Sequence, residues 1–255
     1  MTLSVCIITF NEEANIVRTL ESVKAIADEI VIVDSGSTDS TLALAQARGA
    51  KVFVESWKGF AAQKNSALAK TTCDWILSLD ADEEVSPELA ASIRALLKSS
   101  QTPQFDGYMM NRRNMYLNRW LKRSGYYPDP KLRLIKRGAA TFELRAVHED
   151  MKMTAPKGHL SGDLIHHAYP TLESFIEHAN RYSTLGAEMV VAEHKVGFSF
   201  INIVLRPAVR FLYMYIFRLG FLDGREGLLA LMTHASYVSW KYAKAWELSK
   251  NRVIG

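Results

Sequence analysis

Short apolar runs of strand length alternate with amphipathic stretches through the first hundred residues of the chain. β-branched and aromatic residues dominate these runs, which is typical of strands. The four runs are Leu3–Phe10, Glu29–Asp34, Ala50–Val54 and Trp75–Leu79. Between them, apolar residues recur at helical spacing, as at Ile16, Leu20 and Val23. Strands that alternate with helices predict an α/β fold with a doubly wound parallel sheet.

The helices of this half carry recognisable start signals. Asn11 is a predicted N-cap, which would place Glu12 and Glu13 in a first turn, where the helix dipole favours acids. A second helix is predicted from the cap, proline and acid at residues 86–88, and it should run to about Lys98. We therefore expect a helix directly after the first strand and another after the fourth.

Polar residues follow the strands at the end where parallel sheets bind ligands. Right-handed crossovers place the ends of the first, second and fourth strands on one rim. The rim residues are Thr9, Asn11, Glu12, Asp34, Asp80 and Asp82. Asp34 is suited to accept hydrogen bonds from a base or ribose. Lys64 lies on the predicted helix before the fourth strand. Its side chain either adds positive charge beside the phosphates or is a solvated lysine.

Asp80 and Asp82 have two readings. Side chains two residues apart on a strand point the same way, and paired carboxylates hold hard divalent cations such as Mg²⁺ or Mn²⁺. Alternatively, Asp80 opens a turn and Glu83 begins a helix. The chain has neither a Gly-x-Gly-x-x-Gly nor a Gly-x-x-x-x-Gly-Lys-Ser/Thr motif. Without a glycine cradle, phosphate must be held by a metal and side chains, which favours the metal reading.

Three ordered motifs resemble the inverting family 2 glycosyltransferases of the GT-A fold. They are Val5–Glu13, Ile32–Asp39 and the Asp-x-Asp segment Leu79–Asp82. The resemblance implies a GT-A-type doubly wound, mostly parallel sheet, a nucleotide-sugar donor and a divalent cation. It also implies that Asp34 lies near the uracil or ribose, that Asp82 is the direct metal ligand, and that Asp80 faces the ribose or a metal-bound water.

The segment from Arg112 to Arg137 is the most basic part of the chain, with nine cationic residues against the single acid Asp129. Tyrosines and a tryptophan are interleaved, among them Tyr127. Arginine matches phosphate and aromatic rings pack on sugars, so the segment, with Arg133, suits a sugar-phosphate acceptor. The alternative is a solvated loop. No RNA-binding motif is present, so a nucleic acid partner is not expected.

A histidine and two carboxylates follow at His148, Glu149 and Asp150. Glycosyl transfer needs one general base for the acceptor hydroxyl. Glu149 is the first choice and Asp150 the second, with a surface acidic turn as the alternative, and His148 is assigned to the acceptor site. His166 resembles the histidine that completes the donor-side metal or diphosphate contacts in related enzymes; otherwise it is structural.

The period becomes helical from Leu172 onward, and Phe198–Leu222 combines apolar residues with recurring arginines. Its longest unbroken apolar run, Phe211–Phe217, is far shorter than the roughly 20 residues that span a bilayer. We expect an in-plane amphipathic helix on an anionic membrane surface; the alternative is a core or dimer helix. The predicted organisation is a catalytic domain over 1–170, with a nucleotide-sugar half (1–100) and an acceptor half (101–170), and a membrane-associating helical region over 171–255.

The composition is that of a globular protein. The 255 residues are 48% hydrophobic and 23% charged, with a net charge of +4. Cys6 and Cys73 are the only cysteines and are expected to be reduced.

Three elements of the second half are Lys131–Leu134, His148–Glu149 and the Gly-Phe-Leu-Asp-Gly segment at Gly220–Gly224. With them, this half resembles bacterial lipopolysaccharide core glucosyltransferases. This implies transfer of a hexose, glucose from UDP-glucose in a β linkage, to a heptose of the lipid-anchored inner core, at the cytoplasmic face of the bacterial inner membrane. Two rival functions are a sugar nucleotidyltransferase, which would carry a basic glycine-rich loop after the first strand, and a non-catalytic membrane-surface binding protein.

Overall fold

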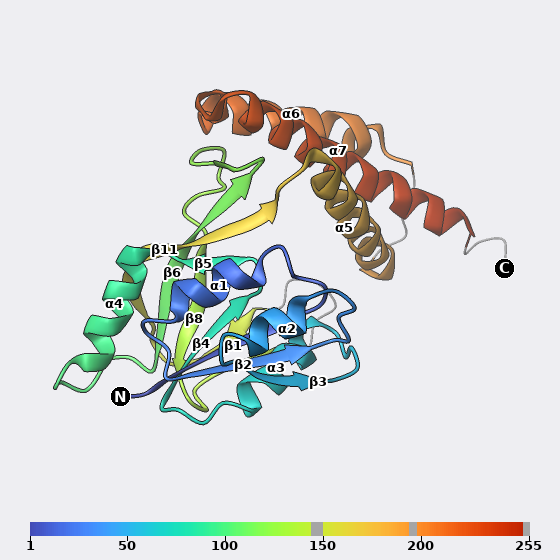
Figure 1. The fold of residues 1–255 in the computed structure, drawn as a ribbon. Coiled ribbons are helices and arrows are strands. Elements are labelled where there is room, and N and C mark those ends of the chain that lie inside the picture. The colour runs from blue at the N-terminus through green and yellow to red at the C-terminus, as the bar shows by residue number, and fades with distance from the viewer. Residues whose placement is uncertain (144–149, 194–197, 252–255) are drawn as a thin grey trace. The chain divides into compact units, whose positions relative to one another are not determined.

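A computed structural model describes residues 1–143, 150–193 and 198–251 of the chain (Figure 1). The chain divides into two compact units. Unit 1 comprises Met1–Arg112 and Asp129–His166, and unit 2 comprises Arg113–Pro128 and His167–Gly255. The boundary predicted at residue 170 differs from this division, because 113–128 groups with the C-terminal helices instead of with the sheet.

The first half of unit 1 is the predicted alternation of strands and helices. Its elements are β1 (Leu3–Thr9), α1 (Ile16–Val23), β2 (Glu29–Asp34), α2 (Thr41–Gln46), β3 (Lys51–Val54), α3 (Phe60–Ala69), β4 (Trp75–Asp80), β5 (Glu83–Val85) and α4 (Pro87–Lys98). Strands β3, β2, β1 and β4 pair in that order, and all their pairings are parallel. The register sets Thr9 opposite Asp34 and Ile8 opposite Asp80, so the rim predicted from the sequence exists.

The sheet continues beyond β4 with antiparallel strands. Its further strands are β6 (Gly107–Tyr116), β7 (Arg119–Trp120), β8 (Pro130–Lys136) and β11 (Gly158–Tyr169). The order runs β4, β8, β6, β11, β5, and β8 pairs antiparallel with both β4 and β6. A separate antiparallel pair consists of β9 (Thr141–Phe142) and β10 (Met151–Lys152). The sheet is thus mixed, with its parallel part within the first hundred residues, and the predicted GT-A-type α/β fold class is confirmed.

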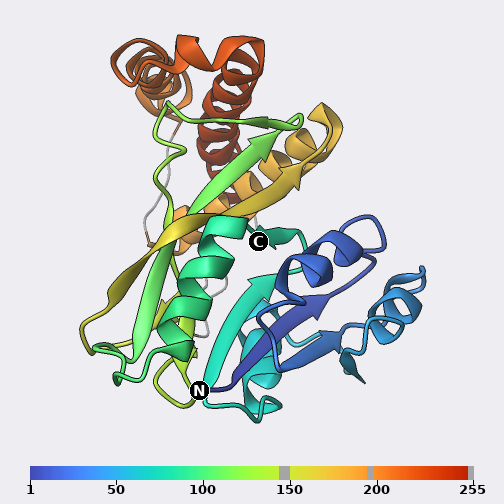
Figure 2. The ribbon, with the colours of Figure 1, turned by 60° about the vertical axis from the view of Figure 1, so that its left-hand side comes forward.

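Alternate residues of the central strands face two separate hydrophobic cores. Val5 and Leu77 pack with α1 and α4 in one core, whereas Cys6 and Ile76 pack with α3 in the other. Figure 2 shows α4 lying along the sheet. Since apolar side chains cover both faces, β1 and β4 are buried except at Ile8 and Asp80, which are partly buried, and this agrees with their near-continuous apolar runs. Burial raises the pKa of the Cys6 thiol to about 12, and both cysteines are free thiols.

The expected helix start at Asn11 was wrong, and so was the alternative in which Glu83 begins a helix. Helix α1 begins at Ile16 instead of directly after Asn11, which has a left-handed φ of 53°. The Oδ1 atom of Asn11 accepts a hydrogen bond from the Thr38 backbone, 2.9 Å away, so this side chain ties two loops together and caps no helix. Glu83 begins strand β5 and no helix, whereas the helix predicted after it does start at Pro87, with Ser86 as N-cap.

Unit 2 is largely helical. Its helical segments are α5 (Leu172–Glu193), the π-helical η1 (Ile201–Leu205), α6 (Arg206–Leu212), the π-helical η2 (Tyr213–Phe217), the 3₁₀ turn η3 (Gly220–Asp223) and α7 (Gly224–Asn251). Helix α5 packs on α7, and the ammonium of Lys244 donates to Asn180, Ser183 and Thr184 across that pair. Among the described residues, every helix is too short or too polar to cross a membrane.

Candidate functional site

The turn that joins β4 to β5 carries the paired carboxylates of the sequence motif. The Oε2 atom of Glu83 accepts a hydrogen bond from the backbone N of Asp80 at 3.1 Å. Thr19, buried on α1, donates to the carbonyl of Ala81 at 2.6 Å. The turn from Asp80 to Glu83 is therefore fixed from both sides before any ligand binds.

Asp80 lies between two cationic side chains. Its Oδ1 is 2.6 Å from the Lys64 ammonium and its Oδ2 is 2.7 Å from the Arg133 guanidinium. Burial alone would raise the pKa of Asp80, but the charges of Arg133 and Lys64 hold it well below its ordinary value. The carboxylate is ionised and neutralised within the protein. The solvated-lysine alternative for Lys64 is wrong, because this side chain is buried against Asp80.

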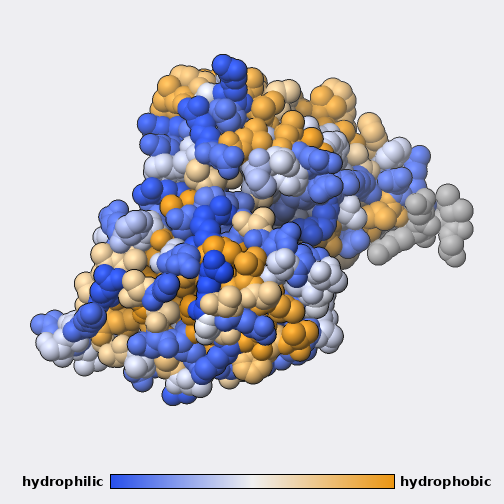
Figure 3. All heavy atoms as spheres, in the orientation of Figure 1, coloured by the Kyte–Doolittle hydropathy of each residue, from blue (hydrophilic) through white to orange (hydrophobic). Residues whose placement is uncertain are grey.

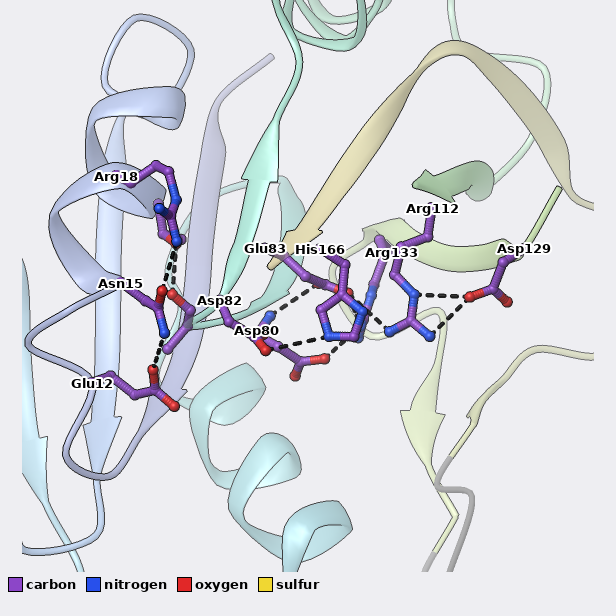
Figure 4. Close-up of polar contacts among 12 residues, drawn as sticks. Glu12, Asn15, Arg18, Asp80, Asp82, Glu83, Arg112, Asp129, Arg133 and His166 are labelled. Atoms are coloured by element: carbon purple, nitrogen blue, oxygen red, sulfur yellow. Dashed lines mark hydrogen bonds and ion pairs between the residues drawn. The ribbon is translucent and has the colours of Figure 1, made fainter. Parts of the chain in front are cut away.

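The ion pairs continue from Arg133 as a chain of alternating charge. Arg133 is 5% exposed and also contacts Glu83 at 2.7 Å, and Glu83 is 0% exposed. Arg112 lies 3.4 Å from Glu83 and 2.8 Å from Asp129 (Figure 4). A buried charge persists only when it is paired in this way. The acceptor-binding role of Arg133 stays a prediction, and these contacts favour a role in positioning the carboxylates.

Asp82 is paired with an imidazole. Its Oδ2 lies 3.3 Å from Nε2 of His166 on β11, and both side chains are partly exposed. Burial would raise the pKa of Asp82, but the nearby His166 lowers it below the ordinary value. The structure thus brings together Asp82 and His166, which are far apart in sequence, beside the neutralised Asp80 (Figure 4).

Asp82 and His166 are suitable ligands for a divalent cation that also binds a phosphate group. Magnesium in nucleotide sites takes one or two carboxylates and completes its shell with phosphate oxygens and water. Asp82 supplies a carboxylate and His166 an imidazole, whereas both oxygens of Asp80 already face cations. In the described part of the chain, three or more potential ligand residues do not converge on one point. A cation held by the protein alone is thus not supported.

Asp34, for which a contact with base or ribose was predicted, is fully buried at the end of β2. Its Oδ2 accepts hydrogen bonds from Thr9 at 2.8 Å and Ser37 at 2.5 Å. Its Oδ1 accepts from the backbone N atoms of Gly36 and Ser37. Since these four bonds use the acceptor positions of the carboxylate, Asp34 shapes the 35–37 loop, and the predicted contact with base or ribose stays a prediction.

The loops after β1 and β2 are joined by several hydrogen bonds. The backbone N of Glu12 donates to Thr41, and that of Glu13 donates to Asp39. The carboxylate of Glu12 accepts from Asn15 at 2.9 Å, and burial raises the pKa of Glu12 above its ordinary value. Glu12 therefore lies on the rim as predicted, close to the Asp82 side of the site (Figure 4).

The predicted base and acceptor residues are less well placed by the structure. Glu149 and His148 lie outside the described residues. Asp150 is exposed, and its backbone carbonyl accepts from Glu143 at 3.4 Å. Tyr127 belongs to unit 2, where its ring meets that of Trp120 edge-on at 5.1 Å. The roles of these residues stay predictions.

Sequence reasoning missed Glu83, Arg112 and Asp129 as members of the site. Glu83 reads as a solvated acid in the run Asp-Glu-Glu, and its burial comes from β5 pairing with β11 at His166. No local pattern marks such a contact, because the partner strand is far away in sequence.

Comparison with known proteins identifies the family. The sequence pattern described as Glycosyl transferase family 2 matches residues 4–151. The chain is 34% identical over 261 residues to the lipopolysaccharide core biosynthesis glycosyltransferase LpsC of Rhizobium meliloti, covering 96% of this chain and 92% of LpsC. It is 31% identical over 256 residues to an uncharacterized glycosyltransferase of Rickettsia typhi, covering 97% of this chain and 87% of that protein.

Two solved structures are similar at a lower level. Staphylococcus aureus TarS 1–349 gives a TM-score of 0.48 at 16% identity, with 99% of this chain and 92% of that chain covered. Glucosyl-3-phosphoglycerate synthase of Mycobacterium tuberculosis, in complex with Mn²⁺, UDP and glucosyl-3-phosphoglycerate, gives 0.34 at 26% identity, with 45% and 44% covered. The assignment rests on the family match over residues 4–151 and on full-length relatives such as LpsC: the chain is a glycosyltransferase and belongs to glycosyl transferase family 2.

Proposed function

We propose that the protein transfers a hexose, glucose from UDP-glucose, to a heptose of the lipopolysaccharide inner core with inversion at the anomeric carbon. The observation that supports this most is the pair Asp82 and His166 beside the neutralised Asp80 at the carboxyl edge of the parallel strands. The relative LpsC acts in lipopolysaccharide core biosynthesis, which agrees with a lipid-anchored saccharide as acceptor.

On the donor side, the nucleoside would lie along the rim formed by Thr9, Asn11, Glu12 and Asp34. Asp82 and His166 would hold a Mg²⁺ or Mn²⁺ ion together with the diphosphate. Such an ion supplies charge neutralisation for the departing diphosphate. Lys64 and Arg133 neutralise Asp80, whereas Asp82 faces the imidazole of His166, and both carboxylates keep a partly exposed face.

Transfer itself forms one bond and breaks one. The acceptor hydroxyl oxygen attacks the anomeric carbon, and the bond from that carbon to the diphosphate oxygen breaks, so UDP leaves with the bonding electron pair. The hydroxyl proton passes to a carboxylate, Glu149 or alternatively Asp150. Tyr127 and His148 are the proposed acceptor contacts.

We further propose a peripheral location on the cytoplasmic face of the bacterial inner membrane. The segment 198–222 exposes many large apolar side chains, including Phe198, Phe200, Ile201 and Phe217. An anionic membrane surface and the lipid-anchored acceptor are the partners that such a segment fits.

A screen of nucleotide sugars against truncated lipopolysaccharide cores, with UDP release as the readout, tests the proposal. UDP-glucose with a core that ends at heptose should give the fastest release. Asp82→Asn should abolish transfer, whereas the matched surface change Asp106→Asn, at a half-exposed carboxylate, should leave it intact. Full activity of Asp82→Asn, or of the native enzyme in excess chelator, would refute the metal role.

The base is assigned by two further variants. Glu149→Gln should remove transfer while UDP binding, measured by calorimetry, is kept. If Asp150→Asn has this effect and Glu149→Gln does not, the base is Asp150.

A further inference from the structure

Unit 2 contains a turn whose large side chains point to solvent. Ile216, Phe217, Leu219, Phe221 and Leu222 surround the end of η2 and the start of η3, and each is at least 40% exposed, with Phe217 at 75%. We call these five residues the apolar tip. Hydrophobic side chains reach the surface over the C-terminal helices in Figure 3. Large exposed apolar patches mark interaction surfaces in soluble proteins.

The inward-facing side of the same turn is tightly packed and is formed by a small residue. Leu219 has a left-handed φ of 57°, which reverses the chain. Gly220 follows, and a Cβ there would collide with Ser124 and Leu231. The turn therefore cannot bury its large residues by rotating, because its inner side has no room for them.

Three cations lie beside the apolar tip. Lys122, Arg123 and Arg218 are exposed, and among the described residues no carboxylate forms an ion pair with them, while the Lys122 ammonium lies 4.5 Å from the centre of the Trp120 ring. Nη2 of Arg218 lies 3.6 Å from where a Cβ on Gly125 would stand, so its guanidinium reaches the loop that carries the other two. We call these three residues the basic collar.

One buried carboxylate joins the collar to the tip. Asp223 is 4% exposed, and its two oxygens accept hydrogen bonds from the backbone N atoms of Lys122 at 3.1 Å and Arg123 at 2.9 Å. The backbone N of Ser124 donates to the carbonyl of Arg218 at 3.1 Å. Ser124 in this loop, and Leu117 and Asn118 in the preceding turn between β6 and β7, are left-handed, a conformation that persists only where the surroundings enforce it.

Two other arginines of unit 2 contact residues within the unit. Arg206 lies 5.2 Å from the ring of Tyr242 and hydrogen bonds to its hydroxyl. Arg119 pairs with Glu226 at 3.2 Å. The arginines that recur in 198–222 thus have different surroundings: Arg206 contacts Tyr242, whereas Arg218 belongs to the collar.

We propose that the apolar tip inserts into the surface of an anionic phospholipid bilayer, that the basic collar binds the headgroup phosphates there, and that Asp223 is the positioning residue that holds the collar at headgroup level. Apolar side chains bounded by cations are what an anionic bilayer surface fits. This inference rests on the membrane location proposed above and identifies the residues that would bind.

Vesicle binding by the full chain, without donor or acceptor, tests the inference separately from glycosyl transfer. Phe217→Ser/Phe221→Ser should weaken binding to vesicles containing phosphatidylglycerol by about tenfold or more. The control Ile176→Ser/Met189→Ser, at exposed apolar positions of α5, should not. Lys122→Ala/Arg123→Ala should weaken it about 30-fold at low salt, with a smaller difference in 0.5 M salt, whereas Lys136→Ala/Arg137→Ala in unit 1 should change it little.

Asp223→Asn separates the positioning role of Asp223 from its charge. Loss of positioning predicts weaker binding to anionic vesicles, whereas loss of a negative charge predicts tighter binding. An asparagine has one acceptor oxygen and would leave one of the two backbone N–H groups without its partner. The variant should bind anionic vesicles about fivefold less tightly, although it removes a negative charge. Glu226→Gln removes the same charge and should bind as well as the native protein or slightly better.

If thermal melting shows that Asp223→Asn does not fold, the variant Lys122→Ala/Arg123→Ala tests the inference instead, because both of these residues are exposed. Native binding by both the tip and the collar variants would overturn the inference. So would tighter binding by a folded Asp223→Asn variant, or a change in oligomeric state caused by the tip variant with no change in vesicle binding.

Discussion

Replacing Arg133 by methionine tests the central ion pairs of unit 1. Arg133 contacts Asp80 and Glu83, each at 2.7 Å, and is 5% exposed. The variant leaves Glu83, which is 0% exposed, with Arg112 at 3.4 Å as its remaining cation. Removing one partner of a buried pair costs about 3–5 kcal/mol, and we expect a loss of this size in the free energy of unfolding at pH 7.

The loss should depend on pH in a defined direction. The pKa of Asp80 is depressed in the folded protein, so its contribution to stability is complete above the unfolded pKa of about 3.9 and disappears as pH falls through the folded value. Arg133→Met removes the positive charge that lowers the pKa of Asp80 most. The stability difference between native protein and variant should be constant from about pH 7 to 5 and shrink below about pH 4.

Urea unfolding at several pH values measures this difference, with unchanged m values as the sign that the same transition is compared. Arg137→Met, at an exposed arginine just beyond the same strand, is the control and should cost less than about 0.5 kcal/mol. A loss below about 1 kcal/mol for Arg133→Met, or a difference that does not change between pH 7 and 3, would show that the pairs do not stabilise the fold.

Two further predictions concern other parts of unit 1. Ser86 accepts hydrogen bonds from the backbone N atoms of Leu89 and Asp163, so Ser86→Ala should cost about 0.5–2 kcal/mol in urea unfolding; an unchanged midpoint would contradict the cap. Cys6 is buried and its pKa is raised to about 12, so a maleimide at pH 8 should label Cys73 in the folded protein and Cys6 only after unfolding. Equal labelling rates by mass spectrometry would contradict its burial.

The local elements could be predicted because local sequence determines them. The apolar runs at Leu3–Phe10 and Trp75–Leu79 predict burial on both faces, and the structure buries their apolar residues in two cores except at Phe10, which lies beyond β1 and is 57% exposed. The residues at the strand ends follow from the same pattern, since parallel strands bring their carboxyl ends to one edge. Prediction failed at Asn11, where a capping residue was expected, because the same amide also bonds a neighbouring loop.

The sequence by itself determined the family motifs, the parallel half of the sheet and the rim on which Thr9, Asp34 and Asp82 lie. Only the tertiary structure decided which charges meet: Asp80 is neutralised by Lys64 and Arg133, Glu83 is buried, and Asp82 faces His166. The physical reason is that periodicity reports whether a side chain faces solvent or core, whereas an ion pair depends on which distant strands become neighbours. Arg133 lies 53 residues beyond Asp80, and only the antiparallel pairing of β8 with β4 brings them together.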